Sequence, residues 1–268
     1  MKSRILSVLC LLALLATAEA AGANVVGRLV DYRVGETVFK GFLAEDTALK
    51  TKRPAVLVVH EWWGHDEYVR RRAVMLAELG YVALAVDMYG DGKTARYPDE
   101  AEKLAGTVLK NRQVTEERFN AALAVLKQQP LVDPARIAAV GYCFGGTVVL
   151  QMARSGSDLK GAASFHGSLA TDTPALPGEV RANLLVLGGD RDTLVPPAQV
   201  QAFLDEMTLA GASFRYIAYQ GAKHGFTNPE SDNYARKFGL PLAYDRRADF
   251  NSWTELRKFL HEIFKKAE

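Results

Sequence analysis

Three side chains of this sequence could together perform nucleophilic catalysis: the Cys143 thiol, the His224 imidazole and the Asp192 carboxyl. A thiol becomes a strong nucleophile when a neighbouring base takes its proton. Histidine suits that task because its ordinary pKa lies near neutral pH. A carboxylate can hold the histidine in the correct tautomer and offset its positive charge. The set therefore predicts hydrolysis through a thioester on Cys143, provided that the fold brings the three groups together.

Cys143 lies in the glycine-rich hexapeptide 141–146, between a short apolar run at 136–140 and a helical pattern at 147–153. A strand, a sharp turn and a helix in direct succession are typical of a nucleophile elbow, G-x-S-x-G, here with cysteine in place of serine. Glycines flank such a residue because the strand and the helix pass closely and the central residue is strained. The start of the helix would stabilise the thiolate. The competing interpretation is a buried structural cysteine in an ordinary turn.

Asp192 and His224 each follow a predicted strand, so that nucleophile, acid and histidine occur in the chain order of α/β-hydrolases. Asp190 is the rival for the acid. We prefer Asp192 because it lies deeper in its loop, beside the turn at 195–196, whereas Asp190 could brace that loop. Singly, a turn-forming aspartate and a satisfied loop histidine are the ordinary interpretations. Together, in order and each after a strand, the residues favour a catalytic set.

The segment His60-Glu61-Trp62-Trp63-Gly64 follows another predicted strand and offers two further functional groups. An oxyanion hole needs two N–H groups, which we assign to the residue after the nucleophile, Phe144, and to Trp62. The Glu61 carboxylate could take the thiol proton or hold it off the imidazole until substrate arrives. An exposed loop glutamate is the alternative.

Aromatic residues cluster in sequence around these loops, and four of them are predicted to line a substrate pocket: Trp63, Tyr89, Tyr142 and Phe226. An aromatic wall would suit a flat or apolar acyl group. Core packing is the alternative use of large rings and accounts for about half of this cluster.

The elements that must position these groups alternate between strands and helices. This pattern predicts right-handed crossovers and a mainly parallel, doubly wound sheet of the α/β-hydrolase type, with the working residues beyond the carboxyl ends of its strands. An antiparallel hairpin around Gly35-Glu36 precedes it. The expected hairpin strands are 25–33 and 37–43, the later strands are 55–59, 81–86, 136–140, 159–165, 183–187 and 214–219, and the helices are 67–79, 98–110, 115–128, a helix from 147, 197–209 and 245–266.

Composition is that of one soluble domain, which we place at 24–268: the chain has 268 residues, 49% hydrophobic residues and a formal charge of +2. No basic block favours a nucleic acid partner. We expect a monomer that acts on a small molecule.

Residues 1–20 have the pattern of a cleaved secretory signal peptide, with a basic start, an apolar stretch and a small-x-small site at 18–20. Residues 21–23 offer a second cleavage site. The apolar stretch is too short for a membrane span, which needs about 20 residues. We therefore expect an exported, periplasmic protein without a membrane partner after cleavage. Its single remaining cysteine, Cys143, could form no intramolecular disulfide and would have no resolving partner as a redox sensor.

These motifs make the sequence resemble the dienelactone hydrolase family, small α/β-hydrolases with a cysteine nucleophile. The resemblance covers the chain after the signal segment. It implies a triad of Cys143, Asp192 and His224 with Glu61 as activating carboxylate, and hydrolysis of an ester or enol lactone, of the carboxylesterase or carboxymethylenebutenolidase type, without a metal or organic cofactor. The segments that carry it are 60–64, Asp87-Met88-Tyr89, 141–146, Asp192 with Val195-Pro196, and Lys223-His224-Gly225-Phe226.

Two departures from the family pattern bear on the substrate. Enzymes of this family that act on dienelactone carry one arginine just after the Asp-Leu-Tyr segment and another shortly after the histidine, which grip the substrate carboxylate. Here the corresponding neighbourhoods are 89–91 and 226–229, and neither holds an arginine. Lys93, Arg96 or Lys223 could substitute, although Asp91 would repel an anion. A non-catalytic small-molecule-binding protein and a peptidase are the alternative functions.

Overall fold

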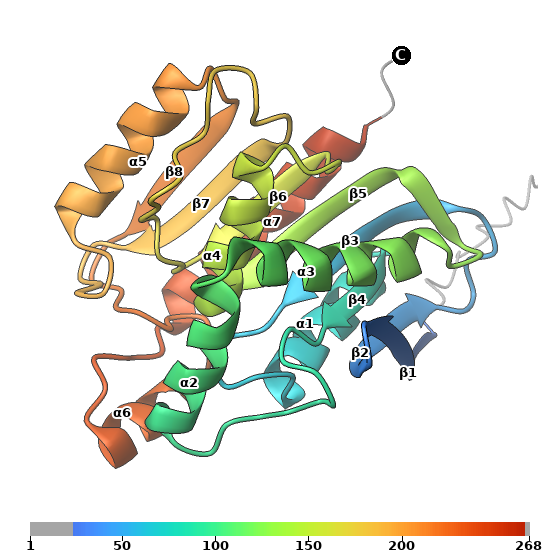
Figure 1. Cartoon of the computed structure of the whole chain (residues 1–268), viewed down its shortest axis with the longest axis horizontal. Helices are drawn as coiled ribbons and strands as arrows, with labels where there is room; N and C mark the ends of the chain where they lie inside the picture. Colours follow the sequence, from blue (N-terminus) through green and yellow to red (C-terminus); the bar gives the residue numbers. More distant parts are fainter. Residues whose placement is uncertain (1–23, 266–268) are drawn as a thin grey trace, which may run out of the picture.

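Residues 24–265, which a computed structural model describes, fold around one eight-stranded sheet with helices on both faces (Figure 1). The strand order is β1-β2-β4-β3-β5-β6-β7-β8. β2 pairs antiparallel with both β1 and β4, and every other neighbouring pair is parallel. The predicted fold class, a mainly parallel sheet with an N-terminal antiparallel hairpin, is therefore confirmed. The predicted signal peptide lies outside the described residues.

From β3 to β8 one or two helices separate successive strands, except that the loop at 166–182 joins β6 to β7 without a helix. The strands are β1 (Val25–Val34), β2 (Thr37–Asp46), β3 (Arg53–Val59), β4 (Val82–Val86), β5 (Val132–Tyr142), β6 (Gly161–Phe165), β7 (Asn183–Gly189) and β8 (Phe214–Tyr219). The helices are α1 (Glu67–Glu78), α2 (Pro98–Leu109), α3 (Arg112–Lys127), α4 (Phe144–Arg154), α5 (Pro197–Leu209), α6 (Ser231–Phe238) and α7 (Arg246–Phe264).

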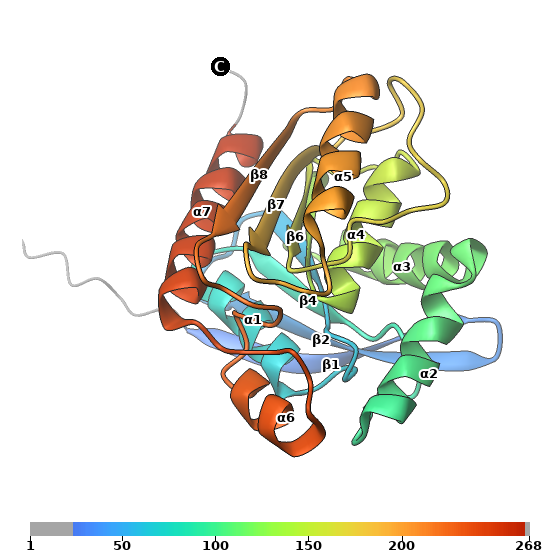
Figure 2. The same cartoon turned by 90° about the vertical axis from the view of Figure 1, so that its left-hand side faces the viewer.

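Two hydrophobic cores, one on each face, hold the sheet between its helices. α1 and α7 cover one face, while α3, α4 and α5 cover the other (Figure 2). Residues 55–59 of β3 are all apolar because both faces of the strand are covered: Leu57 and Val59 enter one core, and Val56 and Val58 enter the other. Successive side chains of a strand point to opposite faces, so a strand covered on both sides must be apolar at every position.

Three elements differ from the sequence-based expectation. α6 is an additional short helix, which packs its aromatic side chains on the loop after β3 rather than on the sheet. α3 begins at Arg112 because the Asn111 side chain accepts a hydrogen bond from the Val114 N–H and caps the helix earlier than its apolar pattern starts. β5 begins at Val132, upstream of its apolar run, where it pairs with the first residue of β3 through an irregular register.

Candidate active site

Cys143 forms the turn between β5 and α4 with φ of 51° and ψ of −115°, a conformation that side chains with a Cβ rarely adopt. The flanking glycines permit this turn. A Cβ on Gly141 would lie 2.0 Å from the Gly145 carbonyl oxygen, and one on Gly145 would lie 2.3 Å from the Val59 carbonyl oxygen. The half-buried sulfur therefore stands at the tip of an elbow that only glycines can close.

The Cys143 sulfur and the Asp192 carboxylate lie on opposite sides of the His224 imidazole. Its Nε2 is 3.1 Å from the Cys143 Sγ, and its Nδ1 is 2.8 Å from the Asp192 Oδ2. The residues follow β5, β7 and β8, whose parallel course brings their carboxyl ends to one edge of the sheet. Three segments distant in sequence thus meet in one hydrogen-bonded line.

Asp192 rather than Asp190 contacts the histidine. Besides His224, Asp192 accepts a hydrogen bond at 2.9 Å from the Leu194 N–H, which fixes its carboxylate within the loop. Asp190 is exposed and accepts a hydrogen bond at 2.6 Å from the Gly221 N–H. It therefore braces the loop that begins the histidine segment.

The charge of the site favours a protonated His224. Burial alone would lower the pKa of this imidazole, but the neighbouring Cys143 and the hydrogen bond to Asp192 outweigh burial and raise its pKa above the ordinary value. An imidazolium beside a thiol is an arrangement that can activate a sulfur nucleophile.

The two N–H groups assigned to an oxyanion hole are both free to donate. Phe144 is the first residue of α4, so its N–H has no acceptor within the helix. Within residues 24–265, the Trp62 N–H makes no hydrogen bond, while the Trp62 carbonyl accepts one at 2.9 Å from the Tyr89 hydroxyl. The elbow and the loop after β3 are joined by the Gly145 N–H, which donates to the His60 carbonyl at 3.0 Å.

His60 is a positioning residue that the sequence did not single out. Its Nδ1 donates to the Glu61 carbonyl at 2.5 Å, and its Nε2 accepts at 3.2 Å from the Met88 N–H. Burial lowers the pKa of His60 to about 4, which keeps the ring neutral in this tautomer. The ring also stacks on Phe144. His60 thereby ties the Glu61–Trp62 backbone to the elbow and to the loop after β4.

Glu61 is buried, with 5% of its surface exposed, and its Oε2 accepts a hydrogen bond at 2.6 Å from the Asn228 side-chain amide. Burial raises the pKa of Glu61 to about 7, against the opposing effects of Asn228, His224 and Arg72. Among the described residues, Glu61 makes no hydrogen bond to Cys143, whose sulfur contacts His224 instead. The alternative of an exposed loop glutamate is therefore wrong.

Replacing Glu61 with glutamine should stabilise the protein by about 3 kcal/mol at about pH 8 and by little at about pH 4. The folded state binds this proton more tightly than the unfolded state does, so native stability falls as pH rises from 4.5 towards about 7. Glutamine removes that loss because it does not ionise. Urea unfolding at both pH values measures the difference, with Glu36→Gln in the exposed β1–β2 turn as control. A gain that is equal at both pH values would contradict the burial argument.

The four aromatic residues assigned to the substrate pocket are all buried. Trp63 and Tyr89 are 3% and 4% exposed, and Tyr142 and Phe226 are 0% exposed. Tyr142 precedes the elbow on a strand, so its ring enters the core opposite to that of Phe144 and packs on Phe165.

Packing explains the other three rings as well. Trp63 stacks on Tyr234 of α6 at 4.3 Å between ring centroids. Phe226 lies edge-on to His166, and Tyr89 orients Trp62 through its hydroxyl group. Trp62 itself is half-buried, so it is the aromatic side chain of this loop that a substrate can reach.

Asp87 fixes the loop after β4 and was recognised from sequence only as part of a motif. Its wholly buried carboxylate accepts hydrogen bonds from the N–H groups of Tyr89, Gly90, Gly92 and Lys40. Four backbone donors replace the water that burial removes. The carboxylate thereby sets the position of Tyr89 beneath Trp62.

Residues 24–265 offer neither a metal site nor a membrane span. No cluster of three or more His, Cys, Asp or Glu side chains in this part of the chain is arranged to hold a metal ion. No helix there is both long and apolar enough to cross a membrane.

The sheet topology, the strained elbow and the order of the reactive loops define a protein of the α/β-hydrolase class. Residues 39–264 match the profile of the dienelactone hydrolase family. The chain belongs to this family, and it is a hydrolase of the dienelactone hydrolase type.

Similar proteins agree with this assignment. The crystal structure of P91, a dienelactone hydrolase-like promiscuous phosphotriesterase from metagenomic libraries, has a TM-score of 0.83 at 33% identity and covers 91% of this chain and 100% of that one. A Bradyrhizobium protein, provisionally named a 2-oxo-3-(5-oxofuran-2-ylidene)propanoate lactonase, is 30% identical over 75% of this chain and 84% of its own. A Salmonella typhimurium protein, provisionally named a carboxymethylenebutenolidase, is 30% identical over 68% of this chain and 70% of its own.

Proposed function

We propose that the chain hydrolyses carboxylic esters or lactones through a thioester on Cys143, with His224 and Asp192 as the other members of a catalytic triad. The observation that carries this proposal is the line of contacts at the elbow, 3.1 Å from sulfur to imidazole and 2.8 Å from imidazole to carboxylate. The family and its relatives support the substrate class. A non-catalytic binding protein would not need a reachable thiol in that line.

Acylation begins when the Cys143 proton moves to the Nε2 of His224. The thiolate attacks the substrate carbonyl carbon, a C–S bond forms, and the carbonyl π electrons move to the oxygen. The Phe144 and Trp62 N–H groups donate hydrogen bonds to this oxyanion. Its collapse breaks the C–O bond of the ester, and His224 returns the proton to the leaving oxygen.

Deacylation uses the same groups with water as the nucleophile. His224 takes a proton from water as the hydroxide attacks the thioester carbonyl, and the oxyanion forms in the same hole. Its collapse breaks the C–S bond and releases the carboxylic acid. His224 then protonates the sulfur or remains paired with the thiolate, while Asp192 keeps the imidazole Nδ1 protonated throughout.

Glu61 contributes to this mechanism through its charge. The sulfur contacts His224 and the Glu61 carboxylate contacts Asn228, so Glu61 is placed to stabilise the imidazolium rather than to bond the thiol. Attraction between the charged carboxylate and His224 stabilises the imidazolium that forms when the imidazole accepts the thiol proton.

We expect uncharged esters and lactones to be better substrates than anionic ones. Asp91 lies just after Tyr89, in the segment where the resemblance would require an arginine. The Asp91 carboxylate is paired with the Lys93 ammonium at 3.1 Å. Asn228, a neutral side chain, occupies the region after the histidine. Neither position offers a free cation for a substrate carboxylate.

Brief incubation with p-nitrophenyl acetate or a lactone should add one acyl group to Cys143, because the thioester forms before water removes it. The experiment is a panel of neutral esters, neutral lactones and dienelactone, quenched in acid and followed by peptide mass spectrometry. Trapped acyl groups on residues other than Cys143, with turnover intact, would overturn the proposed mechanism. Preference for dienelactone over its neutral analogues would overturn the proposed substrate charge.

A further inference from the structure

The Asn228 side chain is buried between two partners that fix its orientation. Its Oδ1 accepts a hydrogen bond from the Glu230 N–H at 2.9 Å, so the other end of the amide, Nδ2, donates to Glu61 at 2.6 Å. Asn228 is 2% exposed and Glu61 5%. The buried carboxylate therefore has a neutral donor that cannot rotate away without losing its own backbone contact.

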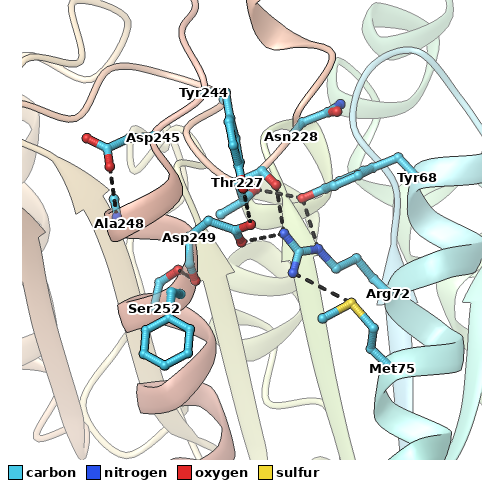
Figure 3. Close-up of polar contacts among 12 residues, drawn as sticks. Tyr68, Arg72, Met75, Thr227, Asn228, Tyr244, Asp245, Ala248, Asp249 and Ser252 are labelled. Atoms are coloured by element: carbon cyan, nitrogen blue, oxygen red, sulfur yellow. Dashed lines mark hydrogen bonds and ion pairs between the residues drawn. The ribbon is translucent and has the colours of Figure 1, made fainter.

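The loop that carries Asn228 also carries His224, and Thr227 clamps it to α1. The Thr227 hydroxyl contacts the Tyr68 hydroxyl at 2.6 Å and the His166 Nε2 at 2.8 Å. Its carbonyl accepts a hydrogen bond from the Arg72 guanidinium at 2.7 Å. Figure 3 shows Thr227 beside the Tyr68 hydroxyl and the Arg72 guanidinium.

Arg72 is in turn held in place by α7. Its guanidinium pairs with Asp249 at 2.6 Å, with side-chain exposures of 6% and 18%, and Tyr244 donates to the other oxygen of that carboxylate at 3.2 Å (Figure 3). Because these groups are largely removed from water, their hydrogen bonds have few competing partners. The loop with His224 and Asn228 is thus a rigid unit rather than a flexible surface segment.

The charges around Glu61 explain why its hydrogen bond from Asn228 matters. Burial and the Asp66 carboxylate disfavour the charged form of Glu61, whereas Asn228, His224 and Arg72 favour it. Titratable and charged groups face Glu61 from several elements: Asp66 before α1, Tyr68 and Arg72 on α1, Tyr142 at the end of β5, His224 after β8 and Tyr234 on α6. Among the groups in residues 24–265 that favour the charged form, Asn228 is the one that donates a hydrogen bond to the carboxylate.

We propose that Asn228 is a positioning residue that aims the Glu61 carboxylate and favours its charged form, so that the His224 loop controls both the base and its electrostatic partner, Glu61. The inference rests on the proposed function, because a charged Glu61 matters only if Cys143 must be ionised. In this proposal, the neutral Asn228 amide orients the buried Glu61 carboxylate towards the His224 imidazole.

Replacing Asn228 with leucine should move the Glu61-dependent rise in acylation rate to higher pH by about one unit. Leucine has a similar size but no donor, and a hydrogen bond to a charged group is worth about that much. The measurement is the stopped-flow burst of p-nitrophenol from p-nitrophenyl acetate across the pH range, repeated in a Glu61→Gln background. In that background the leucine change should cause no shift.

Asn228→Asp separates this effect from simple loosening of the loop, since aspartate can still accept from the Glu230 N–H. It places a second carboxyl against Glu61, so it should shift the rise to higher pH at least as far as leucine does. Asn233→Ala, an exposed change on α6, is the matched control. Unmoved profiles in both Asn228 variants, or shifts that persist without Glu61, overturn the inference. If Cys143 still becomes acylated, the proposed function stands in either case.

Discussion

Cys143→Ala should lower kcat/KM for p-nitrophenyl acetate on the order of 10⁵-fold, because no other group can form the covalent intermediate. The residual activity would come from the oxyanion hole and the binding of substrate, which do not need the sulfur. Steady-state hydrolysis by the purified variant, with the uncatalysed rate subtracted, measures the loss.

The fold should survive this change. Alanine keeps the Cβ and therefore adds no steric demand to the strained elbow, and the closely packed glycines on either side remain. Circular dichroism and thermal unfolding of the two proteins provide the control. A folded alanine variant that keeps most of its activity would remove the thioester mechanism and leave His224 without a nucleophile to activate.

Asp192→Asn should reduce kcat on the order of 10³-fold, while Asp190→Asn should reduce it by less than about tenfold. An asparagine at 192 can no longer offset the charge on His224 and can favour the wrong tautomer through its amide. Asparagine at 190 still accepts from the Gly221 N–H through its side-chain oxygen. The two variants make the same substitution at positions two residues apart, so the difference between them reports on the contact at 2.8 Å between Asp192 and His224.

The pH dependence of the pair provides a second measurement. Loss of Asp192 removes one of the effects that raise the pKa of His224, so activity in Asp192→Asn should depend on pH differently from the parent. Asp190→Asn should leave the profile unchanged. The reverse ranking of the two variants would identify Asp190 as the acid and require the loop to rearrange.

Much of the fold was predictable because short stretches of sequence specify individual strands and turns. The run 55–59 has apolar, mostly β-branched residues on both faces, which suits only a strand between two helical layers, and both cores receive its side chains. Gly35 and Glu36 separate two alternating segments, and β1 and β2 form the expected hairpin. The elbow was predictable because glycines flank Cys143 between a strand and a helix. The steric reason is local for Gly141, whose Cβ would meet Gly145, whereas a Cβ on Gly145 would meet Val59 of β3.

The contacts of single side chains were less predictable. Composition cannot tell whether an aromatic ring beside the elbow faces a pocket or a core, and Tyr142 enters the core because its strand position points it to the opposite face. α6 was missed because its residues are mostly polar, and its aromatic rings pack on Trp63 rather than on the sheet.

The sequence by itself determined the layered fold, the turn that presents Cys143 and the order of the reactive loops, because each depends on neighbouring residues. Only the tertiary structure decided that Asp192 rather than Asp190 meets His224, and that Asn228 meets Glu61 across 167 positions of chain. Such pairings depend on where the ends of separate strands converge. An asparagine before a proline, as at Asn228, usually forms a turn, and the local sequence does not show that its side chain contacts a distant carboxylate.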